Sequence, residues 1–244
     1  MSNLRQSKFK MTIGSDQWKQ RLKQGASYFE LELDDHCLQK FAQFAKELLV
    51  WNQKINLTSI IKPSEIVEKH FIDALAIHPY LCPEATVLDM GAGPGFPGIP
   101  LKLIRPMLKM TLIDASAKKV SFLKHVIRIL KLTDIQAHHM RAKDFPLKRS
   151  EDELFNVVIC RAFSTLDKFL DLALPLLAQG GTALAMKGKF PYGEMKVIGG
   201  NGVDSQTICY RHYDLKVTSL LYQLPFSCSH RSLICFTILN HRHF

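Results

Sequence analysis

The segment VLDMGAGPGFPGIP, residues 87–100, constrains the fold of this chain more than any other stretch. It begins as an apolar strand and then places glycine at four of eight consecutive positions: Gly91, Gly93, Gly95 and Gly98. The last three glycines form the pattern G-x-G-x-x-G, which binds a nucleotide-containing ligand where it follows a strand and opens a helix. We therefore expect a strand, a ligand-binding loop and a helix over residues 85–105.

Alternation of apolar strands and amphipathic helices continues beyond this loop. The sequence predicts strands at 85–90, 110–114, 135–140, 155–160 and 182–187, with helices at 98–105, 118–131 and 165–177. Such alternation builds an α/β fold with a parallel, doubly wound sheet. Two later apolar runs, near 215–222 and 232–238, predict strands on the far edge of that sheet.

A small helical unit is predicted ahead of the sheet. Asp34 can cap a helix whose apolar residues recur at helical spacing. Pro63 suits the first position of a second helix, which Pro83 ends. The chain then divides into a flexible leader at 1–25, a helical unit at 26–84 and a sheet domain at 85–244.

The formal net charge is +10 at pH 7, and the excess lies in the sheet domain. Residues 1–84 carry 11 Lys and Arg against 10 Asp and Glu, whereas residues 85–244 carry 21 against 12. Such an excess is typical of a protein with an anionic partner, and also of a solvated surface that only keeps a protein soluble. The charge leaves both interpretations open.

Composition excludes several classes of protein. The hydrophobic fraction of 47% is ordinary for a globular protein, the apolar runs are too short for a membrane span, and the N-terminus lacks the apolar core of a signal peptide. The six cysteines form no C-x-x-C pair, so we expect reduced core thiols and no metal site. We expect a cytoplasmic monomer with no membrane partner.

Two acidic residues bear on the ligand of the glycine loop. Asp114 ends the second strand, where it can accept hydrogen bonds from a ribose diol, a feature that dinucleotide enzymes share with methyltransferases that use S-adenosylmethionine. Asp89 discriminates between them, because a fixed carboxylate there repels a pyrophosphate and attracts the ammonium and sulfonium of S-adenosylmethionine. No G-K-[ST] follows, which excludes a P-loop. The pattern favours S-adenosylmethionine, and a glycine-rich turn without a ligand is the alternative.

The residues after the fourth strand indicate the methyl acceptor. The sequence there is CRAFST, without the Asn/Asp-Pro-Pro-aromatic motif usual for adenine amines and without the Pro-Cys pair of cytosine carbon-5 enzymes, so Cys160 is interpreted as a core residue. Guanine N7 has a free lone pair and needs positioning rather than a base. A site poor in bases and rich in Arg and Lys is consistent with N7 methylation.

Seven segments carry a family resemblance: WNQKINLTS (51–59), HFIDAL (70–75), VLDMGAGPGFPGIP (87–100), LIDASAKKVSFL (112–123), RAKDF (141–145), CRAFSTL (160–166) and KGKF (187–190). With these the chain resembles the bacterial 16S rRNA guanine-N7 methyltransferase G family, also called glucose-inhibited division protein B. The resemblance implies a Rossmann-like, S-adenosylmethionine-dependent methyltransferase domain behind the helical unit. It also implies methylation of guanine 527 in the 530 loop, with 16S rRNA or the small ribosomal subunit as partner.

Site residues follow from the resemblance by position. Gly91 and Phe96 would line the cofactor pocket, Ala142 and Lys143 would lie by the adenine, and Arg161 would lie beside the cofactor near the acceptor base. The loop argument adds Gly93 and Asp114 to the expected cofactor-binding residues.

Lys143 departs from the family, which usually has Glu at that position. Either the family's contact there is made by the backbone, or Asp144 substitutes, or cofactor affinity is reduced.

Arg161 and Lys187 are the expected catalytic residues, because each ends a strand at the edge where ligands bind. Arg161 can hold the guanine or its phosphate through its planar fork, or can pair with Asp89 or Asp114 as a structural bridge. Lys187 is alternatively a solvated strand end.

Lys118, Lys119 and Lys124 are expected to bind RNA phosphates, although some of them can equally be surface charge. His70 and Asp73, one helical turn apart, can bridge the helical unit to the site, or His70 can simply be a buried, hydrogen-bonded histidine.

Two other functions stay open. One is an S-adenosylmethionine-dependent transferase that acts on a different RNA or on a small molecule. The other is a non-catalytic RNA-binding relative that has kept the fold, and Lys143 is the feature that favours it.

Overall fold

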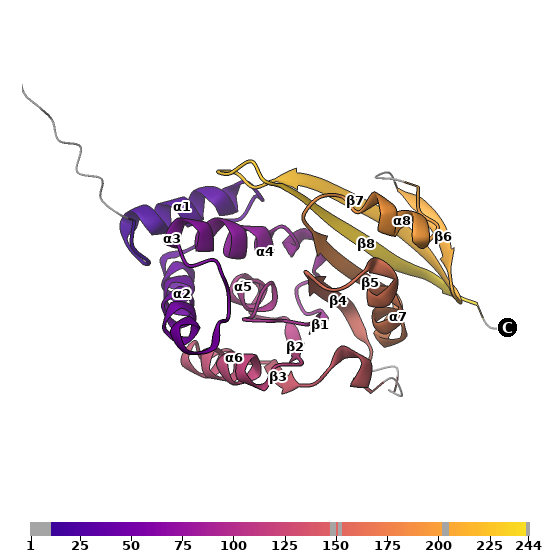
Figure 1. The fold of residues 1–244 in the computed structure, drawn as a ribbon, viewed down its shortest axis with the longest axis horizontal. Coiled ribbons are helices and arrows are strands. Elements are labelled where there is room, and N and C mark those ends of the chain that lie inside the picture. The colour runs from indigo at the N-terminus through magenta and orange to yellow at the C-terminus, as the bar shows by residue number, and fades with distance from the viewer. Residues whose placement is uncertain (1–10, 147–149, 151–152, 202–204, 243–244) are drawn as a thin grey trace, which may run out of the picture.

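The computed structural model describes residues 11–146, 150, 153–201 and 205–242, which build one mixed sheet in the order β3-β2-β1-β4-β5-β8-β7-β6 (Figure 1). The first five strands are β1 (Thr86–Met90), β2 (Lys109–Asp114), β3 (Ile135–His139), β4 (Phe155–Arg161) and β5 (Leu177–Lys187). They are parallel, which confirms the predicted α/β sheet. The chain reverses its strand order between β1 and β4, so the ligand-binding crevice is expected at their carboxyl ends.

The C-terminal part of the sheet is antiparallel. It consists of β6 (Gln206–Tyr210), β7 (Tyr213–Gln223) and β8 (His230–His241). The apolar run near 232–238 does not lie at the edge as predicted, because β8 pairs with β5 on one side and with β7 on the other. The buried residues of β8 explain why this run is continuous rather than alternating.

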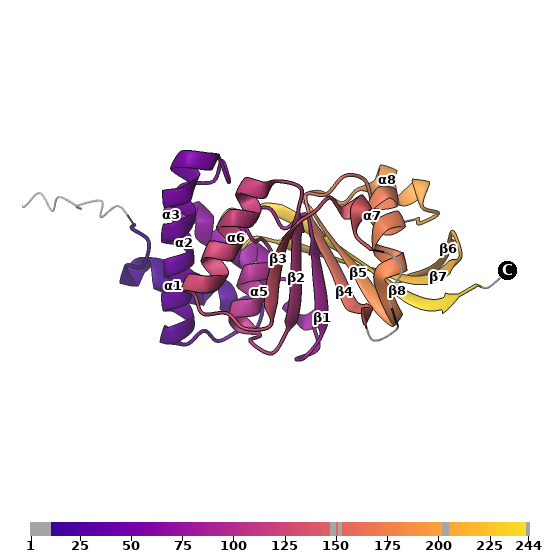
Figure 2. The same ribbon diagram turned by 90° about the horizontal axis from the view of Figure 1, so that it is seen from below.

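Helices cover both faces of the sheet (Figure 2). The helices α5 (Gly98–Ile104) and α6 (Ala117–Ile129) pack on one face, and α7 (Leu166–Ala173) and α8 (Tyr192–Val197) lie on the other. Successive strand residues alternate between the two cores, so Val87 belongs to the first and Leu88 to the second. Short 3-10 helices form at His78–Tyr80 (η2), Ala142–Asp144 (η3) and Leu174–Leu176 (η5).

The helical unit packs against α5 and α6, and it also contacts β4, β7 and β8. Its elements are α1 (Asp16–Ser27), α2 (Asp35–Ile55), α3 (Pro63–Glu65), η1 (Ile66–Ile72) and α4 (Asp73–Leu75). The predicted cap is confirmed, since the Asp34 carboxylate accepts from the Cys37 N–H at 2.6 Å. Pro63 opens the second helix as expected, but this helix ends at Leu75 rather than at Pro83.

The expectation of a flexible leader over 1–25 is wrong for residues 16–25, which belong to α1. Trp18 and Leu22 are fully buried, and the Trp18 indole N–H donates to the Pro63 carbonyl at 3.2 Å. The buried apolar residues of α1 are four positions apart, so they form one narrow stripe on an otherwise polar helix. Such a stripe is difficult to recognise in the sequence. Residues 1–10 lie outside the described residues.

The middle of the second helix is a π-helix, η1, in which the Asp73 N–H donates to the Glu68 carbonyl five residues earlier. This wider turn buries Glu68, His70 and Asp73 together, each only 4% exposed. A π-helical turn within an α-helix is found frequently at functional sites.

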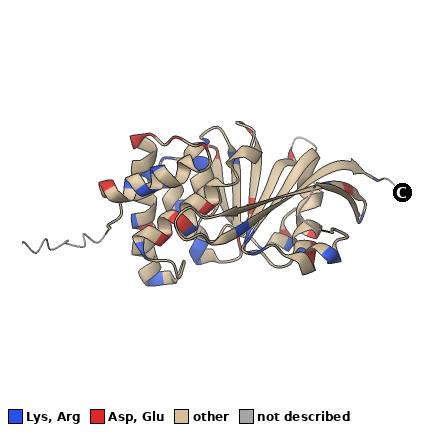
Figure 3. Ribbon diagram, turned by 90° about the horizontal axis from the view of Figure 1, so that it is seen from above, with Lys and Arg blue, Asp and Glu red and all other residues tan. Residues whose placement is uncertain are grey.

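Charges are mixed over the helical unit, where Lys and Arg lie beside Asp and Glu (Figure 3). None of the described helices is long and apolar enough to cross a membrane. Within the same described ranges, no three His, Cys, Asp or Glu side chains gather into a group that could hold a metal ion.

The expectation that the cysteines are core residues holds only in part. Cys160 and Cys235 are buried, whereas Cys82, Cys209 and Cys228 are exposed, and all six are free thiols. The exposed ones lie in the loop before β1, on the edge strand β6 and in the turn between β7 and β8, where an apolar neighbourhood in sequence does not mean burial.

Candidate functional site

The glycine loop closes over the end of β2. Gly91, Gly93 and Gly95 have φ of 78°, 57° and 97°, values that glycine adopts without steric cost. The N–H groups of Gly91 and Ala92 both donate to the Ile113 carbonyl at 2.9 Å. The loop is therefore anchored to β2 by its first residues.

Asp114 also fixes this loop. One carboxylate oxygen accepts from the Gly93 N–H at 2.9 Å and the other from the Ser116 N–H at 2.8 Å. The side chain lies at the end of β2, as the sequence predicted, next to the loop. Its contact with a ribose stays a prediction.

Asp89 lies under the loop and is completely buried. Its Oδ2 accepts from the Gly98 N–H at 2.9 Å, while its Oδ1 has no partner among the described residues. Burial raises the pKa of this carboxyl to about 7, although the Gly98 hydrogen bond and the nearby Arg161 favour the charged form. A buried carboxylate oxygen without a partner fits a cationic ligand, which S-adenosylmethionine is and a pyrophosphate is not.

Phe96 is 2% exposed and packs toward the helical unit. Its ring lies against the imidazole of His70 and beside the rings of Phe44 and Phe71. The expected contact of Phe96 with the cofactor stays a prediction.

The remaining expected cofactor residues lie near the same edge of the sheet. A Cβ on Gly91 would lie 3.5 Å from the ring of Phe163, which follows β4. Ala142 and Lys143 belong to η3 after β3, where Ala142 is half-buried and Lys143 exposed. Backbone pairing joins this region to β2, since the Met140 N–H donates to the Asp114 carbonyl at 3.1 Å.

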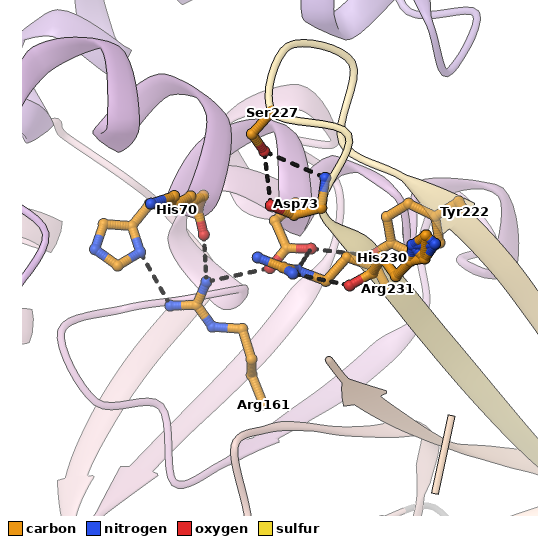
Figure 4. Close-up of polar contacts among 9 residues, drawn as sticks. His70, Asp73, Arg161, Tyr222, Ser227, His230 and Arg231 are labelled. Carbon is orange, nitrogen blue, oxygen red and sulfur yellow. Dashed lines mark hydrogen bonds and ion pairs between the residues drawn. The ribbon is translucent and has the colours of Figure 1, made fainter. Parts of the chain in front are cut away.

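Arg161 is directed toward the helical unit (Figure 4). Its guanidinium donates to the Lys69 carbonyl at 3.1 Å and contacts His70 Nδ1 at 3.3 Å. Its acidic partner is Asp73, at 3.8 Å, instead of Asp89 or Asp114 as the structural alternative proposed. Burial lowers the pKa of Arg161, and Asp73 counteracts that effect. His70 and Asp73 thus do join the helical unit to the site.

His70 is a neutral partner in this contact. Its Nε2 lies 3.0 Å from Thr58 Oγ1, and Asn52 holds Thr58 through two hydrogen bonds to its backbone. Burial and the charge of Arg161 lower the pKa of His70 to about 3. The WNQKINLTS segment therefore positions the imidazole.

Asp73 also accepts hydrogen bonds from two residues that the sequence analysis did not identify. Its Oδ1 accepts from the Tyr222 hydroxyl at 3.0 Å and from Arg231 Nε at 3.1 Å. Both belong to the C-terminal strands, and Figure 4 shows them converging on Asp73 from the side opposite Arg161. A weak signal existed, because Arg231 opens an antiparallel strand and so lies at the edge where the parallel strands end.

A hollow of about 420 Å³ lies beside these residues. It is lined by Ile60, Lys69, His70, Asp73, Arg161, Ala162, Met186, Lys187, Gly188 and Arg231. The hollow adjoins the glycine loop through Ala162, whose neighbour Phe163 faces Gly91.

Lys187 is not a solvated strand end. Its ammonium lies 2.9 Å from a carboxylate oxygen of Glu194 and donates to the Ser164 carbonyl at 3.0 Å. Glu194 in turn accepts from the Leu166 N–H at the start of α7. This pair holds the segment that follows β4.

The three expected RNA-binding lysines do not form one cluster. Lys118 and Lys119 lie in the first turn of α6, close to Asp114. Lys124 lines a separate groove between α6 and β3, together with Arg128 and Lys131. Contact of any of them with RNA stays a prediction.

The sequence model of the family described as "GidB: rRNA small subunit methyltransferase G" matches residues 37–201. The chain belongs to this family. Proteins named ribosomal RNA small subunit methyltransferase G are 45% identical over 158 residues in Desulfitobacterium hafniense and 37% identical over 214 residues in Geobacter sulfurreducens. These alignments span 65% and 87% of this chain, and 66% and 94% of the respective relatives.

Among solved structures, a rRNA methylase from Streptococcus thermophilus is similar with a TM-score of 0.47 and 15% identity, over 67% of this chain and 92% of that one. The family match includes the glycine loop, Asp73, Arg161 and Lys187, whereas Arg231 lies C-terminal to it.

Proposed function

We propose that this chain transfers a methyl group from S-adenosylmethionine to N7 of guanine 527 in the 530 loop of 16S rRNA. Membership of the methyltransferase G family supports an rRNA substrate. One observation supports guanine N7 as the acceptor atom. The two side chains of the hollow that could act as a general base, His70 and Asp73, are already hydrogen-bonded to neighbouring side chains.

The residues around the glycine loop fit the cofactor. Asp89 Oδ1 would take a positive group of S-adenosylmethionine, and Asp114 would take the ribose while it holds Gly93. S-adenosylmethionine, when bound, supplies a methyl group on a positively charged sulfur. The contribution of the chain is to orient that group toward the hollow lined by Arg161.

The basic groups of the hollow explain why N7 is a suitable acceptor. His70 has a pKa of about 3 and uses both ring nitrogens in contacts, and Asp73 is shared by Arg161, Arg231 and Tyr222. Neither is free to remove a proton from an amine or a hydroxyl. Guanine N7 carries no proton, so positioning alone suffices for its reaction.

Cationic side chains around the site suit an RNA substrate. Lys118, Lys119 and Lys124 on α6 would bind backbone phosphates, and the excess of Lys and Arg after residue 84 supports this assignment. Because the proposed substrate is 16S rRNA, alone or in the small ribosomal subunit, we also propose that the protein acts in the cytoplasm.

A methyl-transfer assay tests the proposal. Labelled S-adenosylmethionine is given with 30S subunits from cells that lack this activity, and the modified base is mapped. Label at N7 of guanine 527 is expected, with the reaction slowed steeply by added salt. Label at another base, or a response indifferent to salt, would contradict the proposed acceptor.

Lys143 is the feature that favours a non-catalytic RNA-binding relative, and cofactor affinity separates the two functions. We expect S-adenosylmethionine to bind, because Lys143 is exposed on η3 and the loop contacts of Asp89 and Asp114 are intact. A Lys143→Glu variant provides the control. Binding that appears only in this variant would mean that the native chain does not turn over.

A further inference from the structure

The charges that line the hollow do not balance. Four of its lining residues are cations: Lys69, Arg161, Lys187 and Arg231. Lys69 pairs with Glu65 at 2.8 Å and Lys187 with Glu194 at 2.9 Å. The two arginines share the single carboxylate of Asp73. The lining of the hollow therefore has one cation more than the carboxylates that pair with it, and the buried Asp89, which does not line the hollow, also attracts Arg161.

The two arginines differ in what they can still bind. Arg161 uses Nη1 and Nη2 on the Lys69 carbonyl and His70. Arg231 uses Nε on Asp73 and Nη1 on the His230 carbonyl, and its Nη2 donates to no group among the described residues. The two arginines share the surplus charge, and Arg231 keeps an unused donor, Nη2, on a side chain that is 21% exposed.

Arg231 is also held rigidly. Asp73 is buried, and the Tyr222 hydroxyl donates to the same oxygen that Arg231 contacts. A guanidinium whose geometry is fixed by a buried carboxylate loses little side-chain entropy when it binds a ligand. The unused Nη2 can donate to the oxygens of a phosphodiester, which carries a single negative charge.

We infer that Arg231 binds a backbone phosphate beside the guanine that is methylated, and that Asp73 positions Arg231 for this contact. The inference rests on the proposed function in taking RNA as the substrate. A phosphate bound there would place the adjoining base in the hollow, next to Ala162.

The test is the salt dependence of RNA binding for Arg231→Gln. The logarithm of the affinity for a single-stranded RNA carrying the 530-loop sequence falls linearly with the logarithm of salt, by about 0.7 for each phosphate neutralised. We expect Arg231→Gln to lower that slope by about 0.7, roughly a fivefold loss at 0.1 M salt, and to leave S-adenosylmethionine affinity unchanged. Arg231→Lys keeps the charge and should retain the slope.

Arg242→Gln is the matched control, because Arg242 lies just past the other end of β8 and pairs with Asp214. It should change neither the slope nor the cofactor affinity. An unchanged slope in folded Arg231→Gln would overturn the inference and leave Arg231 as a structural partner of Asp73.

A second measurement needs no folded glutamine variant. Replacing one phosphate beside the target guanine by a neutral methylphosphonate should lower the slope of the native chain by about 0.7 at one of the two flanking positions. No effect at either position would overturn the inference. The methyl-transfer assay tests the proposed function independently. A native chain that methylates another base can still show the decrease in salt dependence when Arg231 is replaced.

Discussion

The imidazole of His70 lies flat against the ring of Phe96, with 4.2 Å between the ring centroids and 9° between the planes. This contact joins η1 of the helical unit to the glycine loop. Arg161 completes it, with its guanidinium 5.0 Å from the centroid of the Phe96 ring. The helical unit is therefore one wall of the candidate site rather than an appendage to the sheet.

Cofactor affinity should rise with pH through about 7. Burial holds the pKa of Asp89 near that value, and only the ionised carboxylate attracts the cationic ligand. Dissociation constants for S-adenosylmethionine measured between about pH 6 and pH 8 test this for the native chain and for Asp89→Asn. The amino group of the ligand titrates identically with both proteins, so equal pH dependence would exclude Asp89 from the contact.

The free energy of unfolding should decrease in acid because of His70. Its pKa is about 3 when folded, because burial and Arg161 disfavour the charged form, whereas an unfolded histidine titrates near 6.5. The unfolded chain thus binds the proton first, and the stabilisation is lost as pH falls below about 6.5, at up to about 1.4 kcal/mol per pH unit.

Asp89 opposes this trend, because its raised pKa adds stability as pH falls below about 7. The comparison is therefore made with His70→Gln by urea unfolding. Between pH 7 and pH 5 the stability difference between the native chain and this variant should shrink by about 2 kcal/mol. A constant difference would mean that His70 has the same pKa in the folded and the unfolded chain.

Arg161→Ala should reduce turnover by about 100-fold or more, since the guanidinium joins the helical unit to the hollow and its loss frees both. Arg161→Lys should recover part of that loss. Turnover and the Michaelis constants for both substrates are the readouts, with thermal unfolding as a check on the fold. Near-normal turnover in the alanine variant would assign Arg161 a structural role only.

Lys187 and Glu194 should act as a unit. Because Lys187 holds the Ser164 carbonyl and Glu194 holds the Leu166 N–H, Lys187→Met and Glu194→Gln should impair turnover to a similar extent. The double variant should be little worse, with a coupling energy in stability of about 1 kcal/mol. A far larger loss of turnover for Lys187→Met alone would instead indicate that Lys187 touches the substrate.

Gly98→Ala should destabilise the fold by several kcal/mol. The added Cβ would lie 2.6 Å from Leu112 and 2.7 Å from the Asp89 carboxylate, which are both buried. Gly188→Ala is the control, because a Cβ there meets nothing within 4 Å. Thermal unfolding of both variants gives the comparison, and similar melting temperatures would contradict the tight packing at Gly98.

Local patterns sufficed to predict the sheet and the glycine loop. The five parallel strands, the cap at Asp34 and the helix start at Pro63 depend on residues close together in sequence, and the structure confirms them. The helix α1 could not be predicted in the same way, since its stripe of apolar residues is narrow and its burial depends on contacts such as the one between Trp18 and Pro63.

The hydrogen bonds and ion pairs of the candidate site were the least predictable part of the structure. Asp73 and Arg231 are separated by 158 residues, and no local pattern connects them. Lys187 was identified, but its partner Glu194 lies on a short helix that periodicity does not reveal. The positions at strand ends were predictable from topology, whereas the pairing of the charges there was not.

Two buried acids, Glu68 on η1 and Asp73 at the start of α4, both bind the end of the β7–β8 hairpin that carries its turn. Glu68 accepts from the N–H groups of Phe226 and Ser227 in the turn, and Asp73 accepts from Tyr222 and Arg231, which pair with each other on β7 and β8 beside that turn. During synthesis the helical unit therefore leaves the ribosome long before the C-terminal hairpin is made. The two carboxylates can form these hydrogen bonds only after almost the whole chain has been synthesised. A nascent chain truncated before the hairpin should lack the side of the hollow that Asp73 and Arg231 form together. The candidate site is therefore the last part of this protein to be assembled.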